Sequence, residues 1–169
     1  MKTLECSSRG DKRFSALYAF VTIKGETKSI EDWYQNAKRN IIGQVPGKGK
    51  KVDCMINPFN GHILPAGCLS DFYTCLWIRY FTEHPDLLEY AKGFDNFNDM
   101  FRGKCVNCQA DVIRECAKDF DGLKKKLTTS DFYKECKGEL YFPEKDIFKK
   151  VLSDAMPKFM KDWSEGNIK

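Results

Sequence analysis

The sequence predicts an α+β fold that is mainly helical, with a small N-terminal β element packed on a helical bundle. Two observations support this class. Aromatic and β-branched residues dominate segment 13–23, which is typical of strands. After residue 70, apolar residues recur at helical spacing. The length of 169 residues and the 42% hydrophobic content fit one globular domain, 1–169, with a single sizeable core.

The N-terminal third contains the expected β element and one well-marked helix. Segment 13–23 is predicted to be extended and is followed by the turn sequence Lys24-Gly25-Glu26. Ser29 is a good N-cap, with Asp32 three residues later, so a helix should run to about Ile41. Residues 43–68 are rich in Gly, Pro, Lys and Asn. A loop of this length in a small domain is usually functional or mobile.

The rest of the chain should be mostly helical. Apolar residues at helical spacing predict helices at about 71–82, 85–91, 104–118, 130–137 and from 143 onward. Pro157 should kink the last of these. Residues 93–103 are expected to be irregular, and the basic run 124–126 is expected to be a solvated turn.

The charge balance limits the choice of partners. There are 28 Lys and Arg against 24 Asp and Glu, a net charge of +4, which permits anionic ligands without requiring nucleic acid. No apolar run approaches the roughly 20 residues of a membrane span, and the first twelve residues lack the apolar segment of a signal peptide. We expect a cytoplasmic protein that does not bind membranes. The sequence does not indicate its oligomeric state.

The eight cysteines are expected to act mostly as small buried hydrophobic residues. Cys105 and Cys108 form a single C-x-x-C pair, and no second pair is present to complete a zinc site. The two missing zinc ligands could come from Cys116, Cys136, His62 or His84 only if the fold brought them next to the pair, which the sequence does not predict. We therefore predict no disulfide, no bound metal and no cofactor.

The helix that begins after Ser29 is the most informative segment. Successive residues lie about 100° apart on a helix, which defines a core stripe made of Ile30, Trp33, Ala37 and Ile41. Beside it runs a polar stripe made of Glu31, Tyr34, Gln35 and Lys38. A carboxylate, a ring, an amide and an amine along one cleft wall can bind and cleave a substrate. The alternative is an ordinary solvated face with weak helical pairing.

A family resemblance rests on two segments of the N-terminal third. Residues 13–18 read Arg-Phe-Ser-Ala-Leu-Tyr, and residues 29–38 read Ser-Ile-Glu-Asp-Trp-Tyr-Gln-Asn-Ala-Lys. Together they resemble the opening of the NADAR family, which has a Phe-Ser-x-Phe-Tyr element, a hairpin and a Ser/Thr-Val-Glu-His-x-Tyr/Phe-Gln-x-x-Lys helix. Segments 76–88 and 94–109 occupy the places of later family motifs, although the family's Trp-Gly pair is absent.

The resemblance implies a NADAR-like fold and an N-glycosidase activity. Members of that family cleave phosphoribosylamino-pyrimidine intermediates of riboflavin synthesis, or remove ADP-ribose from guanine bases. Glu31 would be the catalytic carboxylate, and Lys38 would contact phosphate or attack the anomeric carbon. The resemblance further implies substrate contacts from Arg13, Ser15, Trp33, Tyr34, Gln35, Asp99, Asn107 and Gln109. The expected partner is a phosphorylated nucleotide-like molecule or an ADP-ribosylated base.

Two other functional classes remain open at this point. One is a non-catalytic module that binds or sequesters a nucleotide or nucleotide signal in the same cleft. The other is a nucleic-acid-binding protein that uses the lysine clusters 48–51 and 124–126. The salt dependence of binding distinguishes a nucleic-acid-binding protein from the other two classes, because binding to a phosphate backbone weakens steeply as the salt concentration rises.

Overall fold

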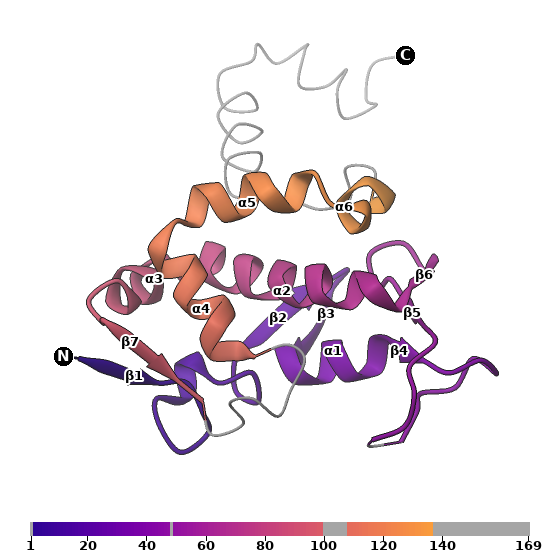
Figure 1. Ribbon diagram of the computed structural model, residues 1–169, viewed down its shortest axis with the longest axis horizontal. Coiled ribbons are helices and arrows are strands. Elements are labelled where there is room, and N and C mark those ends of the chain that lie inside the picture. Colours follow the sequence, from indigo (N-terminus) through magenta and orange to yellow (C-terminus); the bar gives the residue numbers. More distant parts are fainter. Residues whose placement is uncertain (1, 48, 100–107, 137–169) are drawn as a thin grey trace, which may run out of the picture.

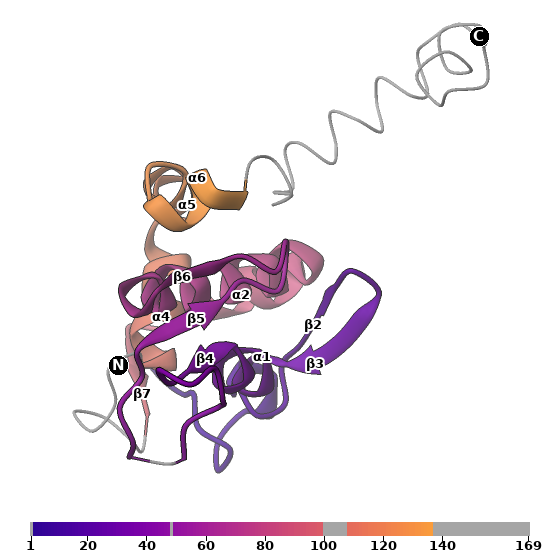
Figure 2. The ribbon, with the colours of Figure 1, turned by 90° about the vertical axis from the view of Figure 1, so that its right-hand side faces the viewer.

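Helix α2 (Leu69–Glu83) runs through the middle of the molecule, and the other elements pack around it (Figure 1). The computed structural model describes residues 2–47, 49–99 and 108–136. Nine residues of α2 are buried, distributed around its circumference, which is the pattern of a helix enclosed by protein. In both views α2 lies between a layer that contains α1 and a layer formed by α5 and α6 (Figures 1 and 2).

Six α-helices and two 3₁₀ turns lie within the described ranges. The helices are α1 (Ile30–Ala37), α2, α3 (Pro85–Ala91), α4 (Gln109–Lys118), α5 (Phe120–Thr128) and α6 (Asp131–Cys136). The 3₁₀ turns are η1 (Lys12–Phe14) and η2 (Ala66–Cys68).

The strands form three small sheets. Strands β1 (Thr3–Glu5) and β7 (Asn96–Asn98) pair in parallel. Strands β2 (Phe20–Ile23) and β3 (Glu26–Ser29) form an antiparallel hairpin, which projects to one side in Figure 2. Strands β4 (Lys38–Arg39), β5 (Cys54–Ile56) and β6 (Ile63–Pro65) form the third sheet in that order. The α+β class is therefore confirmed, although the strands are not confined to the N-terminal third.

Helix α1 begins where the sequence predicts and ends earlier. The Ser29 side chain accepts a hydrogen bond from the Asp32 backbone N–H at 3.1 Å, which is an N-cap. The expected extension to Ile41 is wrong, because Lys38 has extended backbone angles (φ −68°, ψ 141°) and pairs with Met55 in the third sheet. Ile41 consequently leaves the core stripe and is 87% exposed.

The expected strand over 13–23 is shorter than predicted. Lys12–Phe14 is a 3₁₀ turn capped by Asp11, and only Phe20–Ile23 is a strand. The predicted turn at Lys24 and Gly25 is confirmed. Their φ angles are 51° and 80°, the left-handed conformations that a tight hairpin turn requires.

The later helices largely match expectation. The predictions over 71–82 and 85–91 are confirmed, and the prediction over 130–137 is confirmed as far as Cys136, the last described residue. The basic run 124–126 lies in α5, so its assignment as a solvated turn is wrong. The Lys124 side chain is 8% exposed, and its ammonium reaches Asp121 at 3.3 Å. The helix predicted from residue 143 lies outside the described residues, as does the 104–107 portion of another.

The core is aromatic, and most cysteines belong to it. Its largest fully buried side chains include Trp77, Phe14, Phe72, Phe81 and Phe132. Six of the seven described cysteines are buried, and Cys54 is half-buried, which confirms their role as packing residues. Within the described ranges, no helix has the length and apolar character needed to cross a membrane.

Candidate functional site

A group of polar and aromatic side chains gathers where α1 faces α2. We call it the Tyr73 cluster: Glu31 and Tyr34 from α1, Lys38 at its end, Tyr73 from α2, and Asp99 just after β7. The Tyr34 and Tyr73 rings meet edge to face with centroids 4.9 Å apart. Burial raises the pKa of the Tyr73 hydroxyl, and the Glu31 and Asp99 carboxylates raise it further. Residues from three distant parts of the chain therefore converge on one tyrosine.

Glu31 is anchored by its backbone and by its side chain. Its N–H donates to the Ala16 carbonyl at 3.0 Å, and its Oε1 accepts from Gln35 Nε2 at 2.9 Å. The side chain is half-buried in the first turn of α1, where the helix dipole favours a negative charge. Glu31 therefore presents an oriented carboxylate to the cluster.

Lys38 supplies the amine of the cluster. Its Nζ lies 4.4 Å from the Tyr34 ring centroid. Burial lowers the pKa of this amine, whereas the Glu31 carboxylate acts in the opposite direction. Because the burial effect is larger, the neutral, nucleophilic form of Lys38 is reached at a lower pH than for an exposed lysine.

The start of α4 is tied to the same region. Asp99 is 4% exposed, and the Cys108 thiol donates to its Oδ2 at 3.8 Å. Gln109 Oε1 accepts from the Ala16 N–H at 2.7 Å. Gln109 is therefore linked to Glu31 through Ala16, because the Ala16 N–H donates to the Gln109 side chain and the Ala16 carbonyl accepts from the Glu31 N–H.

Three other predicted substrate contacts have different surroundings. The Arg13 guanidinium forms a forked pair with Asp11 at 2.9 and 2.7 Å. Ser15 is 1% exposed, and its Oγ accepts from the Leu17 N–H at 3.4 Å. The Trp33 indole N–H donates to the Val21 carbonyl at 2.7 Å, on the opposite side of α1. Ser15 and Trp33 are buried beside α1, whereas Arg13 lies in η1 with a side chain that is half exposed; Asn107 lies outside the described residues.

Sequence reasoning did not identify Tyr73. The useful signal was the aromatic pair Tyr73 and Trp77, four residues apart on α2, which places both rings on one helical face. The Trp77 indole N–H approaches the Tyr73 hydroxyl without a hydrogen bond of normal geometry. A buried polar pair of this kind identifies a face of α2 that is not purely apolar.

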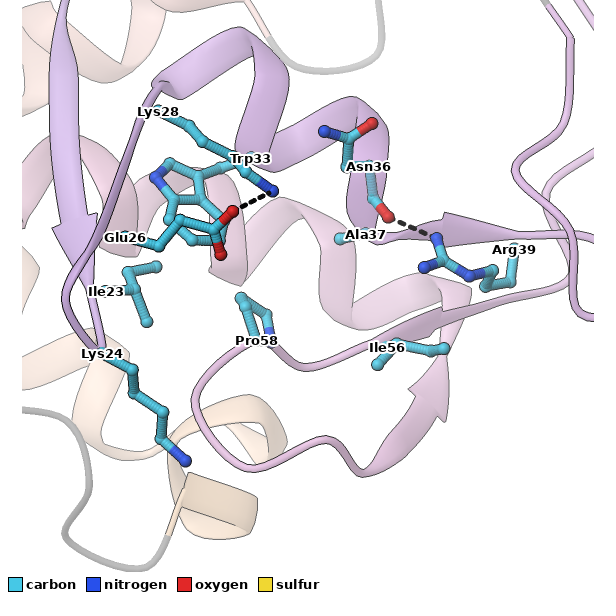
Figure 3. A pocket seen from close by; sticks show the side chains of 10 residues that line it. All are labelled: Ile23, Lys24, Glu26, Lys28, Trp33, Asn36, Ala37, Arg39, Ile56 and Pro58. Atoms are coloured by element: carbon cyan, nitrogen blue, oxygen red, sulfur yellow. Dashed lines mark hydrogen bonds and ion pairs between the residues drawn. The ribbon is translucent and has the colours of Figure 1, made fainter.

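A cavity of about 350 Å³ lies on the other side of α1 (Figure 3). It is lined by helix α1, the β2–β3 hairpin, Arg39 of β4, Ile56 of β5 and Pro58 just after β5. Its walls are Ile23, Lys24, Glu26, Lys28, Trp33, Asn36, Ala37, Arg39, Ile56 and Pro58. Glu31, Tyr34, Gln35 and Lys38 are not among them, so the polar stripe and this cavity are separate features of the same helix.

Neither a protein-family model nor any curated protein matches the sequence. Among the side chains that the structure describes, no three His, Cys, Asp or Glu residues gather as metal ligands. The cluster combines a fixed carboxylate, an amine with a lowered pKa and a tyrosine that keeps its proton, a set suited to acid–base and nucleophilic steps.

Proposed function

We propose that the protein is an N-glycosidase that cleaves the C–N bond between a base and a phosphorylated ribosyl group. The observation that carries the proposal is that Lys38 Nζ lies over the Tyr34 ring, which packs against Tyr73, on the helix whose first turn holds the Glu31 carboxylate through Gln35. The resemblance of segments 13–18 and 29–38 to the NADAR family supports the same reaction and suggests a nucleotide-like or ADP-ribosyl substrate.

Glu31 has a direct part in this reaction. Breaking a ribosyl C–N bond develops positive charge on the anomeric carbon and ring oxygen. A carboxylate near that carbon stabilises the charge, and a half-buried position strengthens the effect because water screens it less. The hydrogen bond from Gln35 holds the carboxylate in place before the substrate arrives.

Lys38 takes one of two roles, which experiment can separate. As an ammonium it binds the phosphate. As a neutral amine its Nζ attacks the anomeric carbon while the C–N bond breaks and the base leaves with a proton. The sugar ring then opens to an imine, which water hydrolyses to release the phosphorylated ribose and regenerate the amine. This route consumes one water molecule and involves no redox change, and the same is true of direct hydrolysis.

The tyrosine pair completes the proposed site. Tyr34 offers a ring beside the base, and Lys38 lies over that ring. Tyr73 keeps its proton because burial raises its pKa. Tyr73 is 3% exposed, so its part is to hold the Tyr34 ring in place through their edge-to-face contact.

Base release from a panel of phosphoribosyl and ADP-ribosyl compounds tests the proposal. We expect Glu31→Gln to lower kcat by about a hundredfold or more, the effect of removing one preorganised electrostatic stabiliser. Substrate affinity should stay within a few fold, because glutamine still accepts the hydrogen bond from Gln35. The control is Asp32→Asn, which removes the same charge from the exposed face of the same helical turn and should leave kcat unchanged.

Lys38→Ala and borohydride trapping separate the two roles of the lysine. A phosphate-binding role predicts a higher KM with little change in kcat, whereas an imine role predicts loss of turnover and of the trapped adduct. Equal turnover in wild type and Glu31→Gln would refute the glycosidase. A wild-type protein that binds a nucleotide tightly and releases no base would instead be the sequestering module.

A further inference from the structure

The cavity in Figure 3 is not used by the proposed glycosidase, and its walls have a definite chemical character. Five lining residues are apolar: Ile23, Trp33, Ala37, Ile56 and Pro58. Four are charged: Lys24, Glu26, Lys28 and Arg39. An apolar wall combined with a few charged groups is typical of small-molecule sites, and about 350 Å³ is at the small end of their range.

The charges around the cavity favour an anion. Three lining residues are basic and one is acidic. Glu26 is already paired with Lys28, whose Nζ lies 3.3 Å from its Oε1. The positive charge of Arg39 is therefore not neutralised by the acidic residue of the cavity.

Arg39 is the group best placed to bind that anion. Its Nη1 donates to the carbonyl oxygens of Asn36 and Lys38, which fixes the guanidinium at the end of α1 (Figure 3). No carboxylate pairs with it among the residues described here. Its remaining N–H groups are therefore available to bind an anion, and the planar guanidinium fork matches phosphate and carboxylate oxygens.

The apolar wall is held rigid beside this cation. The Trp33 indole N–H is fixed on the Val21 carbonyl at 2.7 Å, and the Lys28 ammonium covers its ring at 4.7 Å. Ala37, Ile56 and Pro58 supply the rest of the surface between the ring and Arg39. A flat apolar group packed against this surface would be removed from water, and the binding free energy gained would be proportional to the apolar area buried.

We propose that this cavity binds a small aromatic phosphate, with the phosphate on Arg39 and the ring against Ile56, Pro58 and Ala37. The ligand class includes nucleoside monophosphates and simpler aryl phosphates. The site goes beyond the proposed glycosidase and uses the opposite side of α1, so either one can fail without the other.

Calorimetric titration of the full chain with phenyl phosphate tests the site, with inorganic phosphate and phenol as half-ligand probes. Phenyl phosphate should bind more tightly than either half. Arg39→Gln should weaken binding by about tenfold or more, the effect of losing one charge-assisted hydrogen bond. The matched control is Arg114→Gln on α4, an exposed arginine paired with Asp111, which removes the same charge and should leave binding within about twofold.

Three further variants locate the ligand. Ile56→Thr should weaken binding of phenyl phosphate but not of inorganic phosphate. Lys38→Met and Glu31→Gln should not remove the binding of phenyl phosphate that depends on Arg39, because those residues belong to the Tyr73 cluster. If Arg39→Gln lacks a native far-UV circular dichroism spectrum, Arg39→Lys replaces it, keeping the charge and losing the fork. It should bind several-fold more weakly than wild type.

Three results would overturn the proposal. The first is no binding of phenyl phosphate by wild type up to about 10 mM, a very weak affinity. The second is equal binding by the Arg39 and Arg114 variants. The third is a loss in Lys38→Met as large as that in Arg39→Gln, which would place the anion in the Tyr73 cluster.

Discussion

Replacing Gln109 with leucine should destabilise the protein through a single backbone N–H group. Gln109 Oε1 accepts from the Ala16 N–H at 2.7 Å, and both residues are buried. The Ala16 carbonyl in turn accepts from the Glu31 N–H at 3.0 Å. Two consecutive hydrogen bonds therefore connect the start of α4 to the first turn of α1, and leucine breaks the first of them.

The magnitude follows from what leucine leaves behind. Its volume is close to that of glutamine, so no large cavity forms, but the Ala16 N–H loses its partner in a site without ready access to water. An unsatisfied buried donor costs about 1–3 kcal/mol, and the apolar gain from leucine offsets part of this. Each kcal/mol lowers Tm by about 2–4 °C in a domain of this size.

Urea unfolding monitored by far-UV circular dichroism measures the change. Gln35→Leu is the matched control, because it makes the same substitution at an exposed position of α1 and should stay within about 0.5 kcal/mol of wild type. Amide hydrogen exchange provides a local measurement, since the Ala16 N–H should lose protection only in Gln109→Leu. Equal free energies of unfolding for the two variants would refute the argument that Gln109 supports α1.

Three further predictions follow from other contacts. Ser29→Ala should lower the free energy of unfolding by about 1 kcal/mol, measured by urea titration, because Ser29 caps α1; an unchanged value would contradict the cap. Burial lowers the pKa of Lys38 from 10.5, so between its folded value and 10.5 the unfolded chain holds a proton that the folded chain lacks. The free energy of unfolding should therefore rise with pH over that interval. Urea midpoints measured across the interval should rise less in Lys38→Met than in wild type. An identical pH dependence in the two proteins would contradict the lowered pKa of Lys38. Iodoacetamide should alkylate the half-buried Cys54 well before Cys75, whose thiol pKa is raised by burial; peptide mapping that finds equal rates would disprove the order.

Local signals predicted α1 well at its start and poorly at its end. Ser29 caps the helix, and Ile30, Trp33 and Ala37 are buried, because both features depend on residues within one or two turns. The end at Ala37 depends on β5, a strand that begins fifteen positions after Arg39 at Cys54. Helical spacing in the sequence contains no information about that pairing, so the tertiary contact overrode the local pattern.

The candidate site shows the same division. Glu31, Tyr34 and Lys38 could be grouped from helical spacing alone. Tyr73 and Asp99 join them only through the packing of α1 against α2 and the placement of β7, which no local pattern encodes. Lys124 is a further case, because a basic run suggests solvent, whereas its side chain is buried in α5.

The parallel pairing of β1 with β7 has a consequence for synthesis of the chain. Leu4 pairs with Phe97, so β1 emerges from the ribosome long before the strand that completes its hydrogen bonds. Until Asn98 has been made, the nascent chain carries an unpaired strand edge, a form prone to association. Closing a contact of such long range is also slow. Translation must therefore reach β7 before the β1–β7 sheet can form.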